Sequence, residues 1–427
     1  MRQTLFYIPS WIFDGPLLVT WLIAGGIYFA YLYRQHGSNN ETWSFLPVYG
    51  IVAAVIHFVV PGLGITGINP QDPFGPQIPM GLAVRGYGLF LMLGILSGVG
   101  VTLARCRKIG VSPDQVINLG FWMMLAGIVG ARAFYVIQKP EEFFEKGTNG
   151  FATLTNIVNM TQGGLVVYGS LIGGSIAAVL FLRSQKLSFL KVADLIAPGM
   201  VLGLALGRIG CLMNGCCYGG VCDIELPTLR FPAGSAPYMQ QLYRGDLFGI
   251  QTELVTEGDE SYQKVTAVEP GSLGARSGVV AGDFIAFQFP ESEVIRFVKS
   301  SDNPTSPELK GKKDGMIVTD RLGSVPVDLP ERSRPTHPTQ VYSSVNAFLL
   351  FLTLWFLWTV RKRDGQVFGL MLILYSISRF LIEIIRKDET GQFGTELTIS
   401  QWVSIFTILV GFLIFAVGMT RSGKATT

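Results

Sequence analysis

Charged side chains are scarce in this chain. Asp, Glu, Lys and Arg together make up 15% of its 427 residues, whereas soluble domains carry about a quarter. The net charge is only +3, and no basic cluster resembles a nucleic-acid-binding surface, so we expect no nucleic acid partner. The first residues, MRQTLFYIPSWIFDG, lack a clear positive region and a cleavage site, so we expect no removable signal peptide.

Long apolar runs occupy most of the chain instead, with 49% hydrophobic residues and a mean hydropathy of +0.41. They predict an all-α polytopic membrane protein. Two runs lie in the N-terminal region, and the second is short for a span of about 20 residues, so whether both span stays open. The nine predicted helices cover residues 16–33, 45–60, 84–104, 116–138, 165–182, 192–212, 341–360, 367–385 and 399–419.

Lys and Arg in the short loops set the predicted orientation. With this helix count, the basic loops at 105–108, 183–191 and 361–365 and the tail at 421–424 fall on one side, which the positive-inside rule makes cytoplasmic. The C-terminus is then cytoplasmic. The soluble segment of about 221–334 and the turn at 210–220 lie on the outer side.

The soluble segment contains alternating apolar stretches. Its residues 264–287, KVTAVEPGSLGARSGVVAGDFIAF, predict a strand, a turn, a short helix, a tight Gly282–Asp283 turn and a strand. This pattern resembles a PDZ domain of the bacterial type, with LFGI (247–250) at the place of the carboxylate-binding loop. Such domains bind an extended peptide at a sheet edge. The alternative is a small β-rich spacer without a ligand.

The stretch LALGRIGCLMNGCCYGG (204–220) carries Arg208 inside an apolar run. An arginine at this depth is costly unless it faces a polar cavity or an anion, so it indicates function. The glycines that follow allow backbone to approach a ligand closely. A helix end with a snorkelling arginine is the alternative.

Other ionisable residues lie in the predicted helices. Arg132, in GIVGARAFYVI, either binds an anionic headgroup or pairs with Asp194. Arg379 and Glu383 lie four residues apart and share a helix face, where they form either a functional or a merely self-neutralising pair. The residues that the topology brings towards the outer leaflet are Arg208, Asn214, His337, Arg379, Glu383 and Arg386. Together they suit the phosphate of an anionic phospholipid.

Four motifs, GGLVVYGSLIGG, GRIGCLMNGCCYGG, HPTQVY and FGLMLILYSISRFLIEIIRKDE, closely resemble those of the prolipoprotein diacylglyceryl transferases, in the same order. VRGYGLFLMLGIL and GIVGARAFYVI look like the first two helices of that family. The resemblance divides the chain into an N-terminal extension (1–80), a first membrane part (81–224), the PDZ-like insert (225–333) and a second membrane part (334–427).

The resemblance implies transfer of the diacylglyceryl group of phosphatidylglycerol to the lipobox cysteine of exported prolipoproteins, in the bacterial inner membrane and without a cofactor. Arg208 and Arg379 would hold the phosphate, with Arg132 and Arg386 as further binding residues. Asn214 and Gly215 would shape the headgroup pocket, and Tyr87 would contact lipid. Glu383 would orient Arg379 or assist removal of the thiol proton.

The chain departs from the family pattern where a base is expected. Tyr168 replaces a histidine, Cys211 and Cys216 replace an asparagine and a glutamate, and Ser343 follows HPTQVY in place of an acid. A tyrosine hydroxyl is ordinarily a poor base at neutral pH. The proton acceptor is therefore open among Tyr168, His337 and Glu383.

Three other functions compete with this reading. Cysteines 211, 216, 217 and 222 could form a disulfide, but their spacing fits no familiar zinc site, so we expect no metal. A transporter is disfavoured because no paired inverted repeat is present. A catalytically inactive scaffold that binds peptides through the insert is the main alternative.

Overall fold

The structure, a computed structural model, describes most of the chain. The described residues are 4–8, 12, 16–37, 46, 49–50, 52–54, 56–57, 65–67, 78–143, 153, 156–157, 164, 166–222, 227–233, 235–257, 260–288, 314–386 and 394–420. Two compact units result: Met1–Phe90 with Met213–Gly215, and Leu91–Leu212 with Cys216–Thr427.

The first unit combines a helix and a small sheet. Helix α1, Pro16–His36, is long and apolar enough to span a membrane. Strands β1 (Thr4–Ile8), β2 (Ile65–Gly67) and β3 (Ile78–Arg85) form an antiparallel sheet in the order β1-β3-β2. Half of the second predicted N-terminal helix, 45–60, falls outside the described residues.

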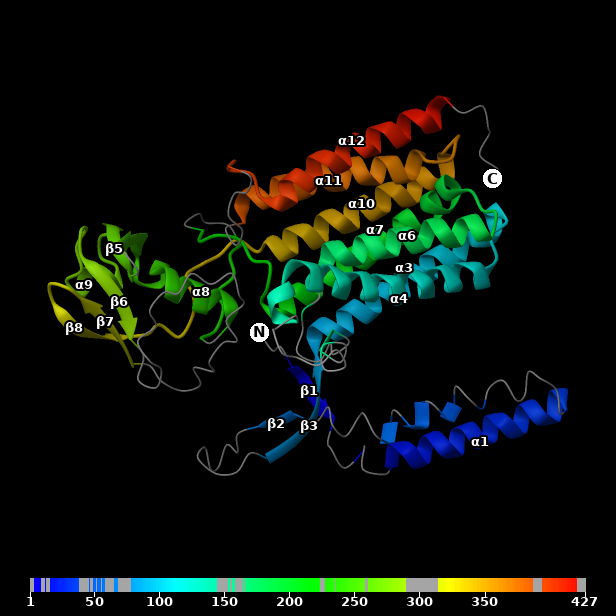
Figure 1. Cartoon of the computed structure of the whole chain (residues 1–427), viewed down its shortest axis with the longest axis horizontal. Helices are drawn as coiled ribbons and strands as arrows, with labels where there is room; N and C mark the ends of the chain where they lie inside the picture. The colour runs from blue at the N-terminus through cyan, green and yellow to red at the C-terminus, as the bar shows by residue number, and fades with distance from the viewer. Residues whose placement is uncertain are drawn as a thin grey trace. The chain divides into compact units, whose positions relative to one another are not determined.

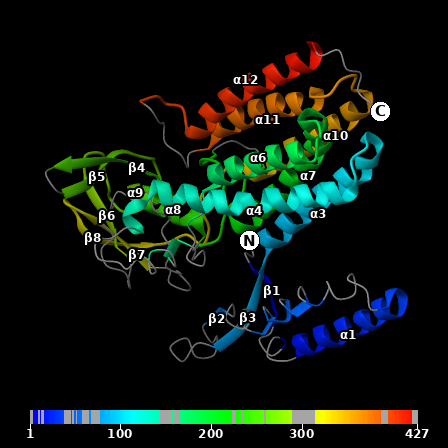
Figure 2. The same cartoon turned by 45° about the vertical axis from the view of Figure 1, so that its right-hand side comes forward.

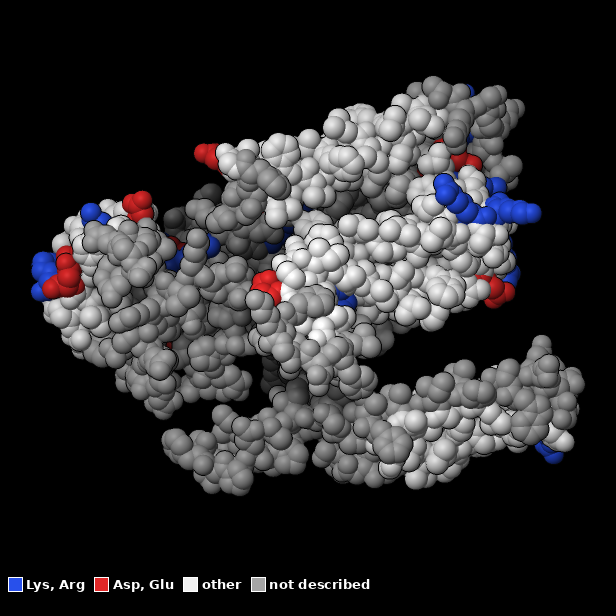
Figure 3. All heavy atoms as spheres, viewed as in Figure 1, with Lys and Arg blue, Asp and Glu red and all other residues white. Residues whose placement is uncertain are grey.

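Eight described helices could cross a membrane, which confirms the predicted polytopic fold. Besides α1 they are α3 (Gly86–Cys106), α4 (Pro113–Gln138), α6 (Val167–Ser184), α7 (Phe189–Asn214), α10 (Thr339–Val360), α11 (Gln366–Ile385) and α12 (Ile399–Thr420). From α3 onwards they lie side by side in both views (Figures 1 and 2). Their sides show few charged atoms in the space-filling view, whereas Lys and Arg gather where helices end (Figure 3).

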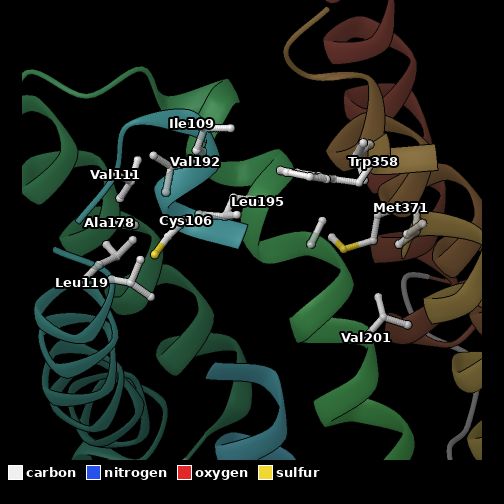
Figure 4. Close-up of a cluster of buried hydrophobic side chains, with 14 of the residues drawn as sticks. Cys106, Ile109, Val111, Leu119, Ala178, Val192, Leu195, Val201, Trp358 and Met371 are labelled. Atoms are coloured by element: carbon white, nitrogen blue, oxygen red, sulfur yellow. The ribbon is translucent and has the colours of Figure 1, made fainter. Parts of the chain in front are cut away.

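Helix α7 occupies the centre of the buried apolar cluster. Its Leu195 lies between Cys106 at the end of α3 and Trp358 of α10, with Met371 of α11 beyond (Figure 4). All four side chains are less than a tenth exposed. Because α7 packs on both halves of the membrane domain, it holds the part before the insert against the part after it.

Glycines let these helices approach closely. A methyl group on Gly98 of α3 would lie 2.7 Å from the carbonyl oxygen of Gly199 in α7. In the α4–α6 pair, a methyl group on Gly169 would collide with the carbonyl oxygen of Gly130. Small residues at such crossings are the usual means by which membrane helices pack.

One buried carboxylate joins α7 to the start of α11. Asp194 accepts hydrogen bonds from the amides of Gly365 and Phe368, each at 2.8 Å, and its Oδ2 lies 3.7 Å from Nε of Arg361. Asp194 is fully buried. The predicted alternative pairing of Asp194 with Arg132 is therefore wrong, because Arg361 and two amides occupy this carboxylate.

The β-rich insert follows α7. It contains α8 (Ala236–Arg244), β4 (Ile250–Glu257), β5 (Glu260–Val268), α9 (Leu273–Arg276), β6 (Phe284–Gln288), β7 (Asp314–Thr319) and β8 (Gly323–Asp328). The strands form one antiparallel meander in sequence order. Buried Tyr238 and Leu242 of α8 pack with Phe248, Ile250 and Ile317 as its core.

The chain segments that enter and leave the insert pair with each other. The amides of Leu229 and Thr336 donate to each other's carbonyl oxygens at 3.1 and 2.9 Å. The amide of Cys222 donates to the carbonyl of Pro335, and that of Phe231 to Oγ of Ser333. We call the described residues of these segments the paired linkers (221–222, 227–233 and 331–336). They return the chain to the membrane domain beside the point where it left.

Candidate functional site

Arg208 lies in α7, near its C-terminal end, with an unusual set of neighbours. Its electrostatic neighbours are Tyr375 of α11, Cys211, Cys217 and Arg386. Within the described part of the chain, no carboxylate or hydrogen-bond acceptor engages its guanidinium. A partly buried guanidinium offers five N–H donors. This one is therefore available to a ligand.

Glu383 of α11 is surrounded by positive charge. Arg379 pairs with its Oε2, and Nη1 of Arg386 lies 3.5 Å from the same oxygen. Its other oxygen accepts a hydrogen bond from Thr398 at 3.2 Å. Glu383 is only 2% exposed, so its carboxylate acts as the counter-ion of two arginines.

Arg379 has a second partner on the last helix. Its Nη2 donates to Oγ of Ser400, in the first turn of α12, at 2.9 Å. We call Arg208, Arg379, Glu383 and Arg386 the arginine cluster. It holds three guanidinium groups and one carboxylate, so its formal charge is +2 (+3 − 1). Such a cluster favours an anion, and a phosphate matches the planar arginine fork.

The turn after α7 is fixed by contacts with the start of α10 and the end of α11. Oγ1 of Thr339 donates to the Cys217 carbonyl at 2.7 Å, and Nε2 of Gln340 donates to that of Cys216 at 2.8 Å. The amide of Gly220 donates to the carbonyl of Ile385, at the end of α11, at 3.0 Å. This turn is therefore held beside the arginine cluster, at the beginning of α10 and the end of α11.

Glycines allow the turn to take this course. Gly215 has φ +76°, a conformation that favours glycine. A methyl group on Gly219 would lie 2.6 Å from Cβ of His337, and the amide of Gly219 donates to the His337 carbonyl. Only glycine permits this approach without displacing the start of α10.

Three thiols gather on this turn. The Sγ atoms of Cys211, Cys216 and Cys217 all lie within 4.8 Å of one another, and all five cysteines of the chain are thiols. Arg208 and Arg386 are electrostatic neighbours of Cys217. We call these three residues the thiol cluster. The two positive charges beside it favour a thiolate and oppose a divalent cation.

Arg132 lies in a site of its own. It donates to the carbonyl oxygens of Asn156 and Ile157 at 2.8 Å and of Gly164 at 3.1 Å. Its guanidinium also lies 5.1 Å from the ring centroid of Phe143. These contacts tie the segment between α4 and α6 to α4.

The remaining predicted residues occupy separate positions. Tyr168, in the first turn of α6, makes no hydrogen bond with any other described residue. Nδ1 of His337 is buried and has no partner among the described residues. Tyr87, 40% exposed, lies in the first turn of α3, and Asn214 ends α7. Tyr168 and His337 thus make no side-chain hydrogen bond or ion pair with the arginine cluster.

Several residues of the site were not predicted. Thr398, just before α12, and Ser400 in its first turn bind the arginine cluster. Gln340 donates a hydrogen bond to the turn, and Tyr375 is an electrostatic neighbour of Arg208. In the sequence, Thr398, Ser400 and Tyr375 stand out only as polar residues in or beside an apolar run. Gln340 stands out only as a member of the HPTQVY motif. Neither signal gives a partner, because the partners are distant in sequence.

The predicted carboxylate-binding loop of the insert has its amides turned inwards. The amides of Phe248 and Ile250 donate to the Gly245 carbonyl at 2.9 and 3.1 Å, and that of Gly249 donates to Asp246 at 3.0 Å. Three of the four amides of this loop are therefore engaged within it and are not available to a terminal carboxylate, which speaks against its predicted role. Strand β4 has β5 as its one neighbour among the described strands.

A cavity of about 180 Å³ lies between the turn and the insert. Tyr218, Gly219, Gly220 and Val221 line it from the turn, and Gln240, Gln241, Arg244 and Asp246 line it from α8 and the residues that follow. Tyr218 donates to Oε1 of Gln240 across it. The cavity directly follows the thiol cluster in sequence, because Tyr218 is next to Cys217.

Comparisons with known proteins agree on one family. A family model described as prolipoprotein diacylglyceryl transferase matches residues 76–417. A Rhodopirellula baltica protein named phosphatidylglycerol–prolipoprotein diacylglyceryl transferase is 35% identical over 96% of this chain and 87% of its own. Proteins of the same name from Clostridium tetani and Bdellovibrio bacteriovorus are 26% and 24% identical over 80% and 82% of this chain, and 96% and 93% of theirs. The chain belongs to the prolipoprotein diacylglyceryl transferase family.

Proposed function

We propose that this protein transfers the diacylglyceryl group of phosphatidylglycerol to the lipobox cysteine of exported prolipoproteins. The observation that carries the proposal is the arginine cluster, with a formal charge of +2 and with Arg208 unengaged by any described side chain. A thioether forms in this reaction, and glycerol phosphate leaves.

Charge development explains why the cluster suits this reaction. The phosphodiester of the lipid carries one negative charge, and the departing phosphate monoester carries up to two at neutral pH. Preorganised cations at the site where charge develops stabilise the transition state more than the ground state. Arg208 and Arg386 are electrostatic neighbours, and we assign to them the phosphate of the bound lipid.

Arg379 and Glu383 have supporting roles in this proposal. Both oxygens of Glu383 are engaged, by two arginines and Thr398, so we assign it as the counter-ion rather than the base. Arg379 connects this carboxylate to Ser400 and completes the positive field around the phosphate.

The residues outside the cluster take positioning roles. Asn214 and Gly215 end α7 and would shape the headgroup pocket, and exposed Tyr87 would contact lipid. Arg132 would act through the loop carbonyls that it binds rather than through an anion.

The proposed setting is the bacterial plasma membrane. Basic residues in three short loops and the tail support a cytoplasmic C-terminus. The turn, the arginine cluster and the insert then face the outer side, where exported prolipoproteins emerge.

We assign to the insert a role in receiving the exported polypeptide. The cavity between α8 and the turn supports this assignment, since it is lined by amides and charges and continues from Tyr218. Deletion of 235–329, joined by a short linker, leaves the paired linkers in place. We expect weaker binding of prolipoprotein with retained turnover of a short lipobox peptide. An unchanged KM for full-length prolipoprotein contradicts this role.

The proposed activity is tested by an assay in membranes with phosphatidylglycerol and a lipobox peptide, read by mass spectrometry of the thioether product. We expect the wild-type protein to form product and Arg208→Ala to lose at least about a hundredfold of the rate, as for loss of a transition-state donor. Tyr168→Phe tests the tyrosine hydroxyl. A folded wild-type protein that forms no product with several peptides overturns the proposal.

A further inference from the structure

Among the described residues, the thiol cluster is a group of ionisable side chains beside the arginine cluster to which the proposed function gives no task. Cys211 lies in the last turn of α7, and Cys216 and Cys217 follow in the turn. Each is partly exposed. Since a thiol has an ordinary pKa of about 8.5, its ionisation is easily shifted by its surroundings.

The geometry favours one thiolate held by two thiols. The three Sγ atoms lie within 4.8 Å of one another, so Cys211 and Cys216 both flank Cys217. The groups that face Cys217 are Arg208 from α7 and Arg386 from the end of α11, with Glu383 as the counter-ion of Arg386. The neighbouring thiols and the two guanidinium charges outweigh desolvation and lower the pKa of Cys217.

The backbone holds this thiol in place. Cys217 has φ +57°, and its carbonyl accepts from Oγ1 of Thr339 at 2.7 Å. The neighbouring carbonyl of Cys216 accepts from Gln340 at 2.8 Å. A side chain fixed in this manner can act at a defined position.

We propose that Cys217 is the proton acceptor of the reaction, a proposal that rests on the transfer function above. The attacked glyceryl carbon is joined through one oxygen to the phosphate. A phosphate held by Arg208 and Arg386 therefore brings this carbon, and the incoming thiol, close to Cys217. The other candidates are placed less well: Glu383 is ion-paired, and Tyr168 and His337 have no side-chain contact with the arginine cluster in the described structure.

The proposed step balances in atoms and charge. The lipobox S–H gives its proton to Sγ of Cys217, and its sulfur forms a bond to the glyceryl carbon. The bond from this carbon to the phosphate oxygen breaks, and its electron pair leaves with glycerol phosphate. Cys217 then returns the proton to water. The phosphate that binds Arg208 and Arg386 offsets the two charges that lower the pKa of Cys217 in the free enzyme, so the bound lipid makes this thiolate a stronger base.

The first test replaces the acceptor and then removes the need for it. We expect Cys217→Ser to lose about a hundredfold or more of kcat with a cysteine lipobox peptide, the usual range for loss of a general base. A selenocysteine lipobox peptide is already ionised at neutral pH, so we expect it to restore Cys217→Ser to within about tenfold of the wild type. A merely structural defect is not restored by this peptide.

Two variants serve as controls. Cys106→Ser keeps a donor to the Leu103 carbonyl and lies outside the site, so we expect wild-type rates. Arg208→Lys should stay slow with both peptides. If the wild type is active, two results overturn the inference and leave the transfer function standing: Cys217→Ser works at the wild-type rate, or Cys217→Ser loses the same factor with both peptides. A wild type inactive with both peptides overturns the transfer function, and the inference with it.

The second measurement is independent of turnover. Iodoacetamide labelling of the full-length protein, mapped by mass spectrometry from pH 5 to 9, reports the thiolate at each cysteine. We expect Cys217 to label with a midpoint below the ordinary thiol value of about 8.5 and with a higher midpoint in Arg208→Ala. A midpoint at or above 8.5 contradicts the proposal.

Discussion

At Glu383 a single buried carboxylate meets the guanidinium groups of Arg379 and Arg386. A partner removed from a buried ion pair leaves an uncompensated charge, at a cost of about 3–5 kcal/mol. The stability of this corner of the molecule and its affinity for an anion are therefore opposed. Glu383 lowers the positive field that binds phosphate, but it also allows three arginines to lie together.

We expect Glu383→Gln to lower the stability of the protein by about 3 kcal/mol, because the amide cannot neutralise Arg379 and Arg386. The measurement is thermal unfolding of the detergent-solubilised protein. Bound phosphatidylglycerol should recover part of the loss, since its phosphate replaces the missing charge. Glu396→Gln, at an exposed position with no partner among the described residues, is the matched control. Equal melting temperatures for the two variants would contradict this account.

The individual site residues were predictable from the sequence to different degrees. Arg208, Arg379, Glu383 and Arg386 stood out because a charge in an apolar run is costly. The structure links these four. Ser400 and Thr398 did not stand out, because hydroxyls are common in membrane helices. The predicted Asp194–Arg132 pair is wrong for another reason. The actual partner, Arg361, lies at a helix end, and its side chain reaches inwards to Asp194.

Among the elements, the α4–α6 pair depends on backbone contact. Gly130 of α4 meets Gly169 and Gly173 of α6 with no room for a side chain. The first turn of α6 also carries Tyr168. A change in the spacing of this pair is therefore expected to reach Tyr168.

We expect Gly169→Ala to destabilise the protein by about 1–3 kcal/mol, since the added methyl group would overlap the Gly130 carbonyl. Gly120→Ala, also in a helix of this pair, has nothing within 4 Å of the added methyl group. That control should be neutral or stabilising by up to about 1 kcal/mol, the difference in helix propensity. The measurement is the melting temperature of both variants in the same detergent. A neutral Gly169→Ala would show that the helices separate without cost.

In the insert, Asp283 receives hydrogen bonds from the Val280 amide at 3.0 Å and from Nε of Arg321 at 3.2 Å. Burial alone would raise its pKa, but the Arg321 and Val280 hydrogen bonds outweigh burial and lower it. A carboxylate with a lowered pKa in the folded state stabilises the fold above its unfolded value of about 4 and loses this contribution as the pH falls further.

We therefore expect the turn at 278–283 to open on acidification below about pH 4. Hydrogen exchange at the Val280 amide in the full-length protein measures this opening, after correction for the intrinsic pH dependence of exchange. Asp283→Asn should show the open behaviour at every pH. Protection at Val280 that stays the same from pH 6 to pH 3 would contradict the assigned role of this carboxylate.

Periodicity and turn signals predicted the elements well. The predicted helix at 192–212 matches α7, Phe189–Asn214, and the strand–helix–strand pattern of 264–287 matches β5, α9 and β6. The inward amides of the predicted carboxylate-binding loop were not foreseen, because LFGI specifies a tight turn without specifying which way its amides point. The N-terminal sheet was not predicted, because its strands pair across about 75 residues between Tyr7 and Ala83.

For the whole molecule, orientation is the property on which the proposed function depends. The Arg–Lys loops set it in the sequence, and an enzyme that meets exported substrates needs its arginine cluster on the outer side. Two exposed positions on opposite sides of the proposed topology can report it: Lys264 in the insert and Ser188 in the loop before α7.

We expect a membrane-impermeant maleimide to label Lys264→Cys in spheroplasts, and Ser188→Cys only after permeabilisation. The wild-type protein gives the background from its five native thiols. Labelling of Ser188→Cys in intact spheroplasts would contradict the proposed topology, because it would mean that the insert lies in the cytoplasm.

The paired linkers also suggest how such a chain can change over generations. Because Leu229 and Thr336 bind each other's backbone, the two ends of the insert meet at one point of the membrane domain. The whole folded insert can therefore be gained, lost or exchanged at this point while the two halves of the enzyme stay joined.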